Sequence, residues 1–409
     1  MIDFSMPEPI RKQRVMLQTV AENMMRPVSR QFDEHEHEIP WDYINFMQMA
    51  MRATQAGSLA PREGRHEGPR LGYQILAHLI ETLSWGDAGL YLCTPGGGLG
   101  AAAVEATGTP EQKEKFLKRF AEEKPILACM AMTEPQAGSD TASIRTTAVR
   151  QDGSWVLNGE KIFVTAGHKS LVDTPGFVVV WATIDPAAGR AGMRPFVVEA
   201  GTPGMSVTKL EHKMGIRASD TASIVFQDCK VPLENILGSP EVVKGPSTAG
   251  GFKGAMATFD ATRPLVAASA MGVARATVEL VKDLLKQEGI QIRYNVPRQK
   301  LTQIEREVID MEVMLRGAWL LVVKAVWMAD QRTPNSLESS MAKVKAGDAV
   351  TKITQRAVEL MGPIGYSRKQ LLEKWFRDAK INDIFEGTGQ INRLVVARRI
   401  LGYGSRELR

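Results

Sequence analysis

Apolar residues change their spacing twice along this chain, and that change constrains the fold more than any other feature. Up to about residue 127, and again from about residue 241, they recur every three or four positions, as on the buried face of a helix. Between these regions they form short runs bounded by turn residues, which is typical of strands. The order is therefore helical, then β, then helical, and we divide the chain into domains at 1–127, 128–240 and 241–409.

The longest helical pattern lies in the last region, at 301–330. It predicts the core face of a helical bundle, because one apolar side is kept throughout. The apolar residues on that side are Leu301, Ile304, Val308, Met311, Leu315, Ala318, Val322 and Ala325. Further helices are expected in this region at about 256–287, 335–361, 367–380 and 387–402. In the first region, Thr109 and Gln112 have the spacing of a capping box, which predicts a helix start.

The middle region reads as a small β-barrel or sandwich. Residues 146–150 and 155–157 flank the turn dipeptide Asp152-Gly153, which is a strong hairpin signal. Further strands are expected at 177–183, 195–199, 206–209 and 222–226. No helix-length segment separates these strands, so a parallel sheet is not expected.

Composition excludes several classes of protein. Of the 409 residues, 44% are hydrophobic and 24% are charged, which is ordinary for a globular chain. Three scattered cysteines do not form a disulfide framework or a zinc cluster, and they favour a reducing, cytoplasmic location. The N-terminus lacks a secretory pattern, and no stretch has the uninterrupted apolar length of a membrane span. The net charge of +5 suits an anionic small molecule but gives no reason to expect nucleic acid.

Two motifs point to chemistry that their context does not support. Gly98, Gly100 and Ala103 match the dinucleotide-binding pattern G-x-G-x-x-A, but the following helix is too short and no strand–helix alternation surrounds it. We read Gly96–Gly98 as a connection near a ligand pocket. His35 and His37 alternate with glutamates, a spacing that points the two imidazoles to different sides of a helix. We therefore expect a solvated segment here and no metal site.

Three segments carry a composition that suits a ligand site. In 130–140, a strand ends at Thr133 and a turn follows with Ser139, so hydroxyls and backbone N–H groups gather there. In 161–167, Phe163 and Thr165 are expected on one face of a strand, where they could pack and bond a flat ring. In 384–393, Glu386 follows apolar residues and precedes a helix. It reads equally well as a desolvated general base and as a carboxylate stabilised by a helix N-terminus.

Taken together, these segments resemble the acyl-CoA dehydrogenase flavoprotein family. The resemblance extends from about residue 8 to 403 and rests on five co-linear segments. They are MTEPQAGSD at 132–140, KMGIRASDTASIVFQDCKVP at 213–232, FDATRP at 259–264, ELMGPIGYS at 359–367 and RDAKINDIFEGTGQINRLVVARRIL at 377–401. It implies an α+β multidomain fold with an N-terminal α-helical domain, a middle β-barrel domain and a C-terminal four-helix bundle.

The resemblance also implies an activity and its residues. An acyl-CoA thioester would be desaturated to the trans-2-enoyl-CoA, with Glu386 as the base that takes the α-proton and flavin N5 of FAD as the hydride acceptor. The runner-up is an oxidase of the same fold that passes electrons to oxygen. The residues implied for FAD are Met132, Thr133, Ser139, Phe163, Thr165, Arg293, Glu359, Gly362, Thr388 and Gln390. Those implied for the acyl-CoA are Ser139, Phe259, Asp260, Arg263 and Gly387.

The chain departs from the family pattern where the adenine end of FAD would bind. Arg293 is followed by Tyr-Asn-Val-Pro-Arg298 rather than by the usual Phe and Gly, so Arg298 is an alternative to Arg293. Glu359 stands where Gln is common, and Pro363 where a second Gly is common. Because the family binds FAD across subunits, the resemblance implies a homotetramer, and it implies an electron-transferring flavoprotein as acceptor.

Overall fold

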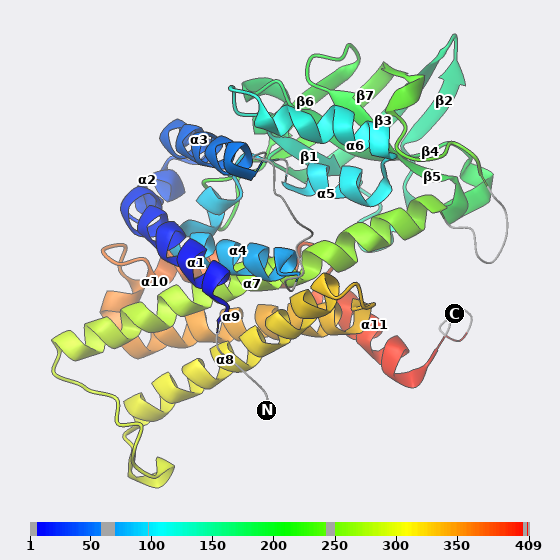
Figure 1. Ribbon diagram of the computed structural model, residues 1–409. Coiled ribbons are helices and arrows are strands. Elements are labelled where there is room, and N and C mark those ends of the chain that lie inside the picture. Colours follow the sequence, from blue (N-terminus) through cyan, green and yellow to red (C-terminus); the bar gives the residue numbers. More distant parts are fainter. Residues whose placement is uncertain (1–5, 59–69, 97, 243–249, 404–406, 408–409) are drawn as a thin grey trace.

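The computed structural model describes residues 6–58, 70–96, 98–242, 250–403 and 407. A sheet occupies one end of the molecule, and long helices extend away from it (Figure 1). The first helices lie alongside these long helices and against the sheet. The predicted order of helical, β and helical regions is confirmed.

Two groups of helices make up the N-terminal region. The group that contains α4 packs against the C-terminal bundle, and the group that contains α5 packs on the sheet. Their bounds are α1 Glu8–Val20, α2 Ser29–Glu34, α3 Trp41–Ser58, α4 Gly72–Tyr91, α5 Gly98–Thr107 and α6 Pro110–Leu117. The capping box predicted at the start of α6 is confirmed: Thr109 accepts from the backbone of Gln112, and the Gln112 side chain accepts from the backbone of Thr109.

The glycines before α6 serve packing. A Cβ on Gly100 would lie 2.7 Å from the backbone carbon of Ala128, so only glycine lets α5 approach the first strand this closely. The α5 helix ends at Thr107, as the sequence indicated. Gly97, part of the predicted connection near the pocket, lies outside the described residues.

The predicted β-barrel domain is a curled seven-stranded sheet. Its strands run in the order β1-β4-β2-β3-β7-β6, with β5 also paired to β4. The bounds are β1 Ala128–Ala131, β2 Thr147–Gln151, β3 Ser154–Thr165, β4 Phe177–Thr183, β5 Met193–Glu199, β6 Met205–Leu210 and β7 Thr221–Pro232. The hairpin of β2 and β3 is confirmed, and both turn residues, Asp152 and Gly153, have the positive φ of a type I′ turn.

The sheet is not a parallel one, as expected, but it is mixed: most neighbouring strands pair antiparallel, and β4 has parallel neighbours. Strand β4 lies parallel to β1 along four residue pairs, and it also meets β2 in parallel at its end. The chain between β1 and β4 contains the whole β2–β3 hairpin. That connection is long enough for the chain to return to the same end of the sheet, although no helix of the usual crossover type is present.

Five helices form the C-terminal region: α7 Gly250–Gln287, α8 Gln303–Asp330, α9 Ser336–Tyr366, α10 Leu372–Ala379 and α11 Gly389–Leu401. The three longest lie side by side (Figure 1). The apolar pattern predicted for α8 is confirmed. Its residues Val308, Met311, Ala318, Val322 and Ala325 are fully buried in the shared core.

The α7 helix is the most apolar of these. Its segment Thr258–Gln287 is long and apolar enough to cross a membrane by length and composition alone. However, 72% of its most apolar window is buried inside the protein, against α4, α8 and α9. We therefore interpret α7 as the core helix of the bundle.

A buried ion cluster joins the three regions. Lys374 of α10 donates to Asp87 of α4 at 2.7 Å and to Asp378 at 2.6 Å. Asp378 in turn accepts from the backbone N–H of Ile216, which precedes β7. All three charged side chains are buried, so each charge depends on the others for its stabilisation.

Candidate active site

Glu386 lies in the short connection before α11, with an uncommon backbone conformation. Its φ is +57°, and the next residue, Gly387, has a φ of +91°. This bend turns the Glu386 side chain toward α7, where the Thr262 hydroxyl donates to Oε2 at 2.7 Å. A non-glycine residue at positive φ is strained, and such strain is found most often at functional sites.

The contacts of Glu386 discriminate between the two interpretations that the sequence left open. The N-cap of α11 is Thr388, whose side chain accepts from the backbone of Ile391. Glu386 precedes this cap, and its carboxylate accepts a hydrogen bond from Thr262 of another helix, α7. The geometry therefore favours a desolvated carboxylate over one that serves the α11 N-terminus.

Burial is the main influence on the acidity of Glu386. Desolvation raises the pKa of this carboxyl, while the Thr262 hydrogen bond and the cations Arg263 and Lys343 lower it in part. The net effect is a pKa above the ordinary glutamate value. A raised pKa makes the carboxylate a stronger base.

The residues expected to meet the acyl-CoA are brought close to Glu386. Arg263 is buried, and its guanidinium donates to Asp260 at 2.7 Å and lies 5.9 Å from the Phe259 ring centroid. A Cβ on Gly387 would be 4.0 Å from the same guanidinium. Four of the five residues predicted for the acyl-CoA, namely Phe259, Asp260, Arg263 and Gly387, thus form one cluster. The fifth, Ser139, lies exposed in the turn after β1.

The two segments expected at the flavin are joined by backbone pairing. The carbonyl of Thr133 accepts from the N–H of Ile162 at 2.9 Å, which ties the exit of β1 to β3. Met132 is buried beside this junction, whereas Ser139 is exposed in the turn that follows. The structure therefore places Thr133 close to the segment that holds Phe163 and Thr165.

Phe163 does not sit on a regular strand, as the sequence led us to expect. The register of β3 against β7 shifts between Lys161 and Val164, and Phe163 has a φ of +57°. A bulge of this kind re-aims a side chain, so strict alternation does not place Phe163 with Thr165. The Phe163 ring is 61% exposed, and a large aromatic ring left open at a bulge fits the flat surface of a bound flavin.

A buried ion pair under this segment was missed from the sequence. Lys161 donates to Glu134 at 2.7 Å and to the carbonyl of Met132 at 3.0 Å. Burial would raise the pKa of Glu134, but Lys161 and the backbone N–H of Arg145 bring it down to about 2. The sequence of this turn does not indicate that Glu134 pairs with a buried lysine instead of facing solvent.

The two arginines considered for the adenine end of FAD do not meet Glu386 within one chain. Arg293 precedes α8 and pairs with Glu305 through two of its nitrogens, at 2.6 and 2.7 Å. Arg298 pairs in the same way with Asp310. The segment between α7 and α8 that carries both arginines lies at the opposite end of the bundle from α11 (Figure 1).

The other residues expected at the adenine end of FAD are divided between the same two ends of the C-terminal bundle. Glu359 is paired with Arg356 at 2.6 Å near the end of α9, and Gly362 has a φ of +52° at a kink in that helix. Thr388 and Gln390 lie at the start of α11, near Glu386. One chain therefore presents two separate parts of this expected set.

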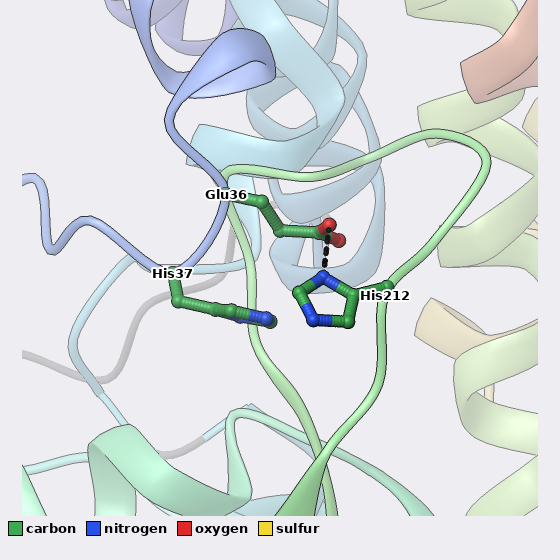
Figure 2. A group of neighbouring side chains, drawn as sticks. All are labelled: Glu36, His37 and His212. Atoms are coloured by element: carbon green, nitrogen blue, oxygen red, sulfur yellow. Dashed lines mark hydrogen bonds and ion pairs between the residues drawn. The ribbon is translucent and has the colours of Figure 1, made fainter.

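In the structure, His212 lies beside Glu36 and His37 of the segment whose alternating His and Glu residues suggested a metal site. Glu36 accepts from His212 at 3.2 Å, and the His37 ring lies beside them (Figure 2). However, Arg217 lies 3.2 Å from the same carboxylate, and the Lys213 ammonium 3.6 Å. Because these two cations already offset the charge of Glu36, they oppose the binding of a metal cation, and we propose no metal site here.

Comparisons with known proteins agree along the whole chain. Residues 8–124, 129–229 and 249–401 match the N-terminal, middle and C-terminal domains of acyl-CoA dehydrogenase, respectively. The mitochondrial short-chain specific acyl-CoA dehydrogenase of Rattus norvegicus is 33% identical over 400 residues, which cover 97% of this chain and 91% of that relative.

Two solved structures share the fold. Butyryl-CoA dehydrogenase from Megasphaera elsdenii has a TM-score of 0.84 at 30% identity and covers 98% of this chain and 100% of its own. A chain from a structure described as the electron transferring flavoprotein of Acidaminococcus fermentans has a TM-score of 0.83 at 32% identity, with the same coverage. The chain belongs to the acyl-CoA dehydrogenase family and is an FAD-dependent oxidoreductase.

Proposed function

We propose that this enzyme desaturates an acyl-CoA thioester to the trans-2-enoyl-CoA, with Glu386 as the base that removes the α-proton. The observation that carries the proposal is the half-buried Glu386 carboxylate, held by Thr262 next to the Phe259–Arg263 segment. Carboxylates in such surroundings are suited to take a proton from carbon near neutral pH.

The protein contributes mainly position and electrostatics. The hydrogen bond from Thr262 fixes one carboxylate oxygen, so the bend at Glu386 and Gly387 presents the base in one orientation. Arg263, itself held by Asp260, supplies a buried positive charge next to the site for an anionic substrate. When bound, FAD accepts the β-hydrogen as hydride. We assign Met132, Thr133, Ser139, Phe163 and Thr165 to holding its ring.

We further propose a homotetramer that contains FAD sites made by two subunits. Within one chain, the segment between α7 and α8 that carries Arg293 lies at the opposite end of the bundle from α11, which supports a site completed by a neighbouring subunit. An electron-transferring flavoprotein is proposed as the electron acceptor, and the cytoplasm as the location. The three cysteines are all buried and free, which suits a reducing compartment.

Flavin reduction under anaerobic conditions tests the function. We expect FAD in the wild-type protein to bleach with at least one member of a panel of short, medium, branched and aromatic CoA esters. Glu386→Gln should bind FAD and acyl-CoA but reduce the flavin about 10²–10⁴-fold more slowly, since Gln cannot take a proton. Near-normal bleaching by this variant would reject Glu386 as the base.

The oxidase alternative is tested on the reduced enzyme. Stopped-flow reoxidation by O₂ is compared with reoxidation by an electron-transferring flavoprotein at matched concentrations. A dehydrogenase should react much faster with the flavoprotein, and faster reaction with O₂ would instead indicate an oxidase.

A further inference from the structure

Lys343 of α9 is a buried cation that the proposed mechanism does not use. Its side chain is 1% exposed, and the part of the chain that the structure describes offers its ammonium no hydrogen-bond partner. Burial lowers the pKa of Lys343 to about 8, and Asp383 and Glu386 oppose that shift. An unpartnered buried ammonium is costly, so its presence calls for a compensating electrostatic role.

The face of α9 that carries Lys343 packs near the connection that leads to Glu386. Gly347 lies one turn further along α9, on the same face as Lys343. A Cβ on Gly347 would be 3.0 Å from the carbonyl oxygen of Asn382 and 3.3 Å from Asp383 Cα. This close approach brings that face of α9 against residues 382 and 383, which lead into the connection that carries Glu386.

The charged and titratable groups around Glu386 come from three helices. Arg263 approaches from α7 with its partner Asp260, Lys343 from α9, and the half-buried phenol of Tyr91 from α4. Arg263 already has Asp260 at 2.7 Å. Lys343 is therefore the cation of this group whose charge is not committed to a hydrogen bond with another described residue.

We propose that Lys343 is a positioning residue for Glu386, whose buried ammonium adds to Thr262 and Arg263 in stabilising the carboxylate form and so lowers the pH at which the base begins to act. The inference rests on the proposed role of Glu386. Its physical basis is that a charge interacts strongly with an opposite charge where water is excluded. Without Lys343, burial would act on Glu386 with only Arg263 and Thr262 to oppose it.

Removing the charge tests the inference directly. In FAD-loaded protein, the titration of the Glu386 carboxyl is followed by difference infrared spectroscopy, its band being identified by its loss in Glu386→Gln. Lys343→Met should move the midpoint to higher pH by on the order of one unit. The acidic limb of the flavin-reduction pH profile should move with it. Lys343→Arg should keep the wild-type midpoint.

Lys345→Met is the matched control. Lys345 lies on the same helix but is exposed, so the same substitution should leave both the infrared midpoint and the pH profile unchanged. An unmoved Glu386 midpoint in Lys343→Met, or an equal shift in both variants, would overturn the inference.

A reciprocal measurement covers the case in which Lys343→Met does not fold. Coupling between two groups is mutual, so Glu386→Gln should lower the titration midpoint of Lys343, followed by NMR of labelled lysine side chains, by a similar amount. An unchanged Lys343 midpoint would overturn the inference. The proposed function fails separately: Glu386→Gln would then keep its flavin-reduction rate, whatever the two midpoints show.

Discussion

At the scale of single residues, one hydrogen bond that the sequence did not reveal contributes to the acidity of Glu386. Thr262 stands inside the FDATRP segment, yet only the fold places its hydroxyl on the Glu386 carboxylate at 2.7 Å. This bond stabilises the charged form of Glu386 and so lowers its pKa.

Thr262→Val should therefore raise the pKa of Glu386. Because α-proton removal needs the carboxylate, the acidic limb of the flavin-reduction rate should move to higher pH, while the rate well above that limb stays close to wild type. Thr258→Val is the control, since the Thr258 hydroxyl donates to the backbone carbonyl of Gly254 one turn earlier in α7. A limb shifted equally in both variants, or in neither, would contradict this role for Thr262.

Arg263 gives a second prediction at this scale. Arg263→Lys keeps the positive charge but cannot reproduce the geometry of the guanidinium that donates to Asp260. The affinity for acyl-CoA should therefore fall about tenfold or more. Equilibrium titration of the flavin spectrum with substrate measures it. Arg332→Lys, on an exposed turn after α8, should leave the affinity unchanged.

At the scale of elements, the glycine motif at Gly98 and Gly100 looks like a ligand site in the sequence but serves helix packing in the structure. Gly100→Ala should destabilise the protein by about 1–3 kcal/mol, because the new methyl group meets the backbone of Ala128 at 2.7 Å. Gly317→Ala, in the open middle of α8, should be neutral or stabilising, since alanine favours a helix. Thermal unfolding of both variants compares them, and equal stability would show that α5 can move away from β1.

Local patterns in the sequence predicted the elements well, and contacts between distant residues account for what they missed. The α8 core face, the β2–β3 hairpin and the Thr109 cap all follow from spacing within one segment. The bulge at Phe163 and the parallel pairing of β4 depend on partner strands far along the chain. The buried ion pair of Glu134 with Lys161 joins the turn after β1 to strand β3, so no pattern within one segment could predict it.

At the scale of the whole molecule, the buried cluster of Asp87, Lys374 and Asp378 connects α4, α10 and the middle domain. Lys374→Met should cost about 3–5 kcal/mol, because it leaves two carboxylates buried without their cation. Lys369→Met, at an exposed site just before α10, is the control and should change stability little. Chemical denaturation measures both, and a small loss for Lys374→Met would show that the carboxylates are reached by water.

The last prediction concerns assembly. Three large apolar side chains, Val313, Leu320 and Trp327, recur every seven residues on α8 and are 63%, 53% and 51% exposed in the single chain. A stripe of this kind on a long helix is typical of a surface that another helix covers.

We therefore expect Trp327→Glu to dissociate the proposed tetramer, since a buried carboxylate opposite apolar neighbours would oppose association. Because the FAD sites are proposed to need two subunits, the dissociated protein should also lose FAD. Val149→Glu places the same charge on an equally exposed apolar position of β2 and should leave assembly intact. Sedimentation with detection at the flavin band follows mass and FAD together. A wild-type monomer that carries FAD would contradict the shared site, and an intact tetramer of Trp327→Glu would move the interface away from this face of α8.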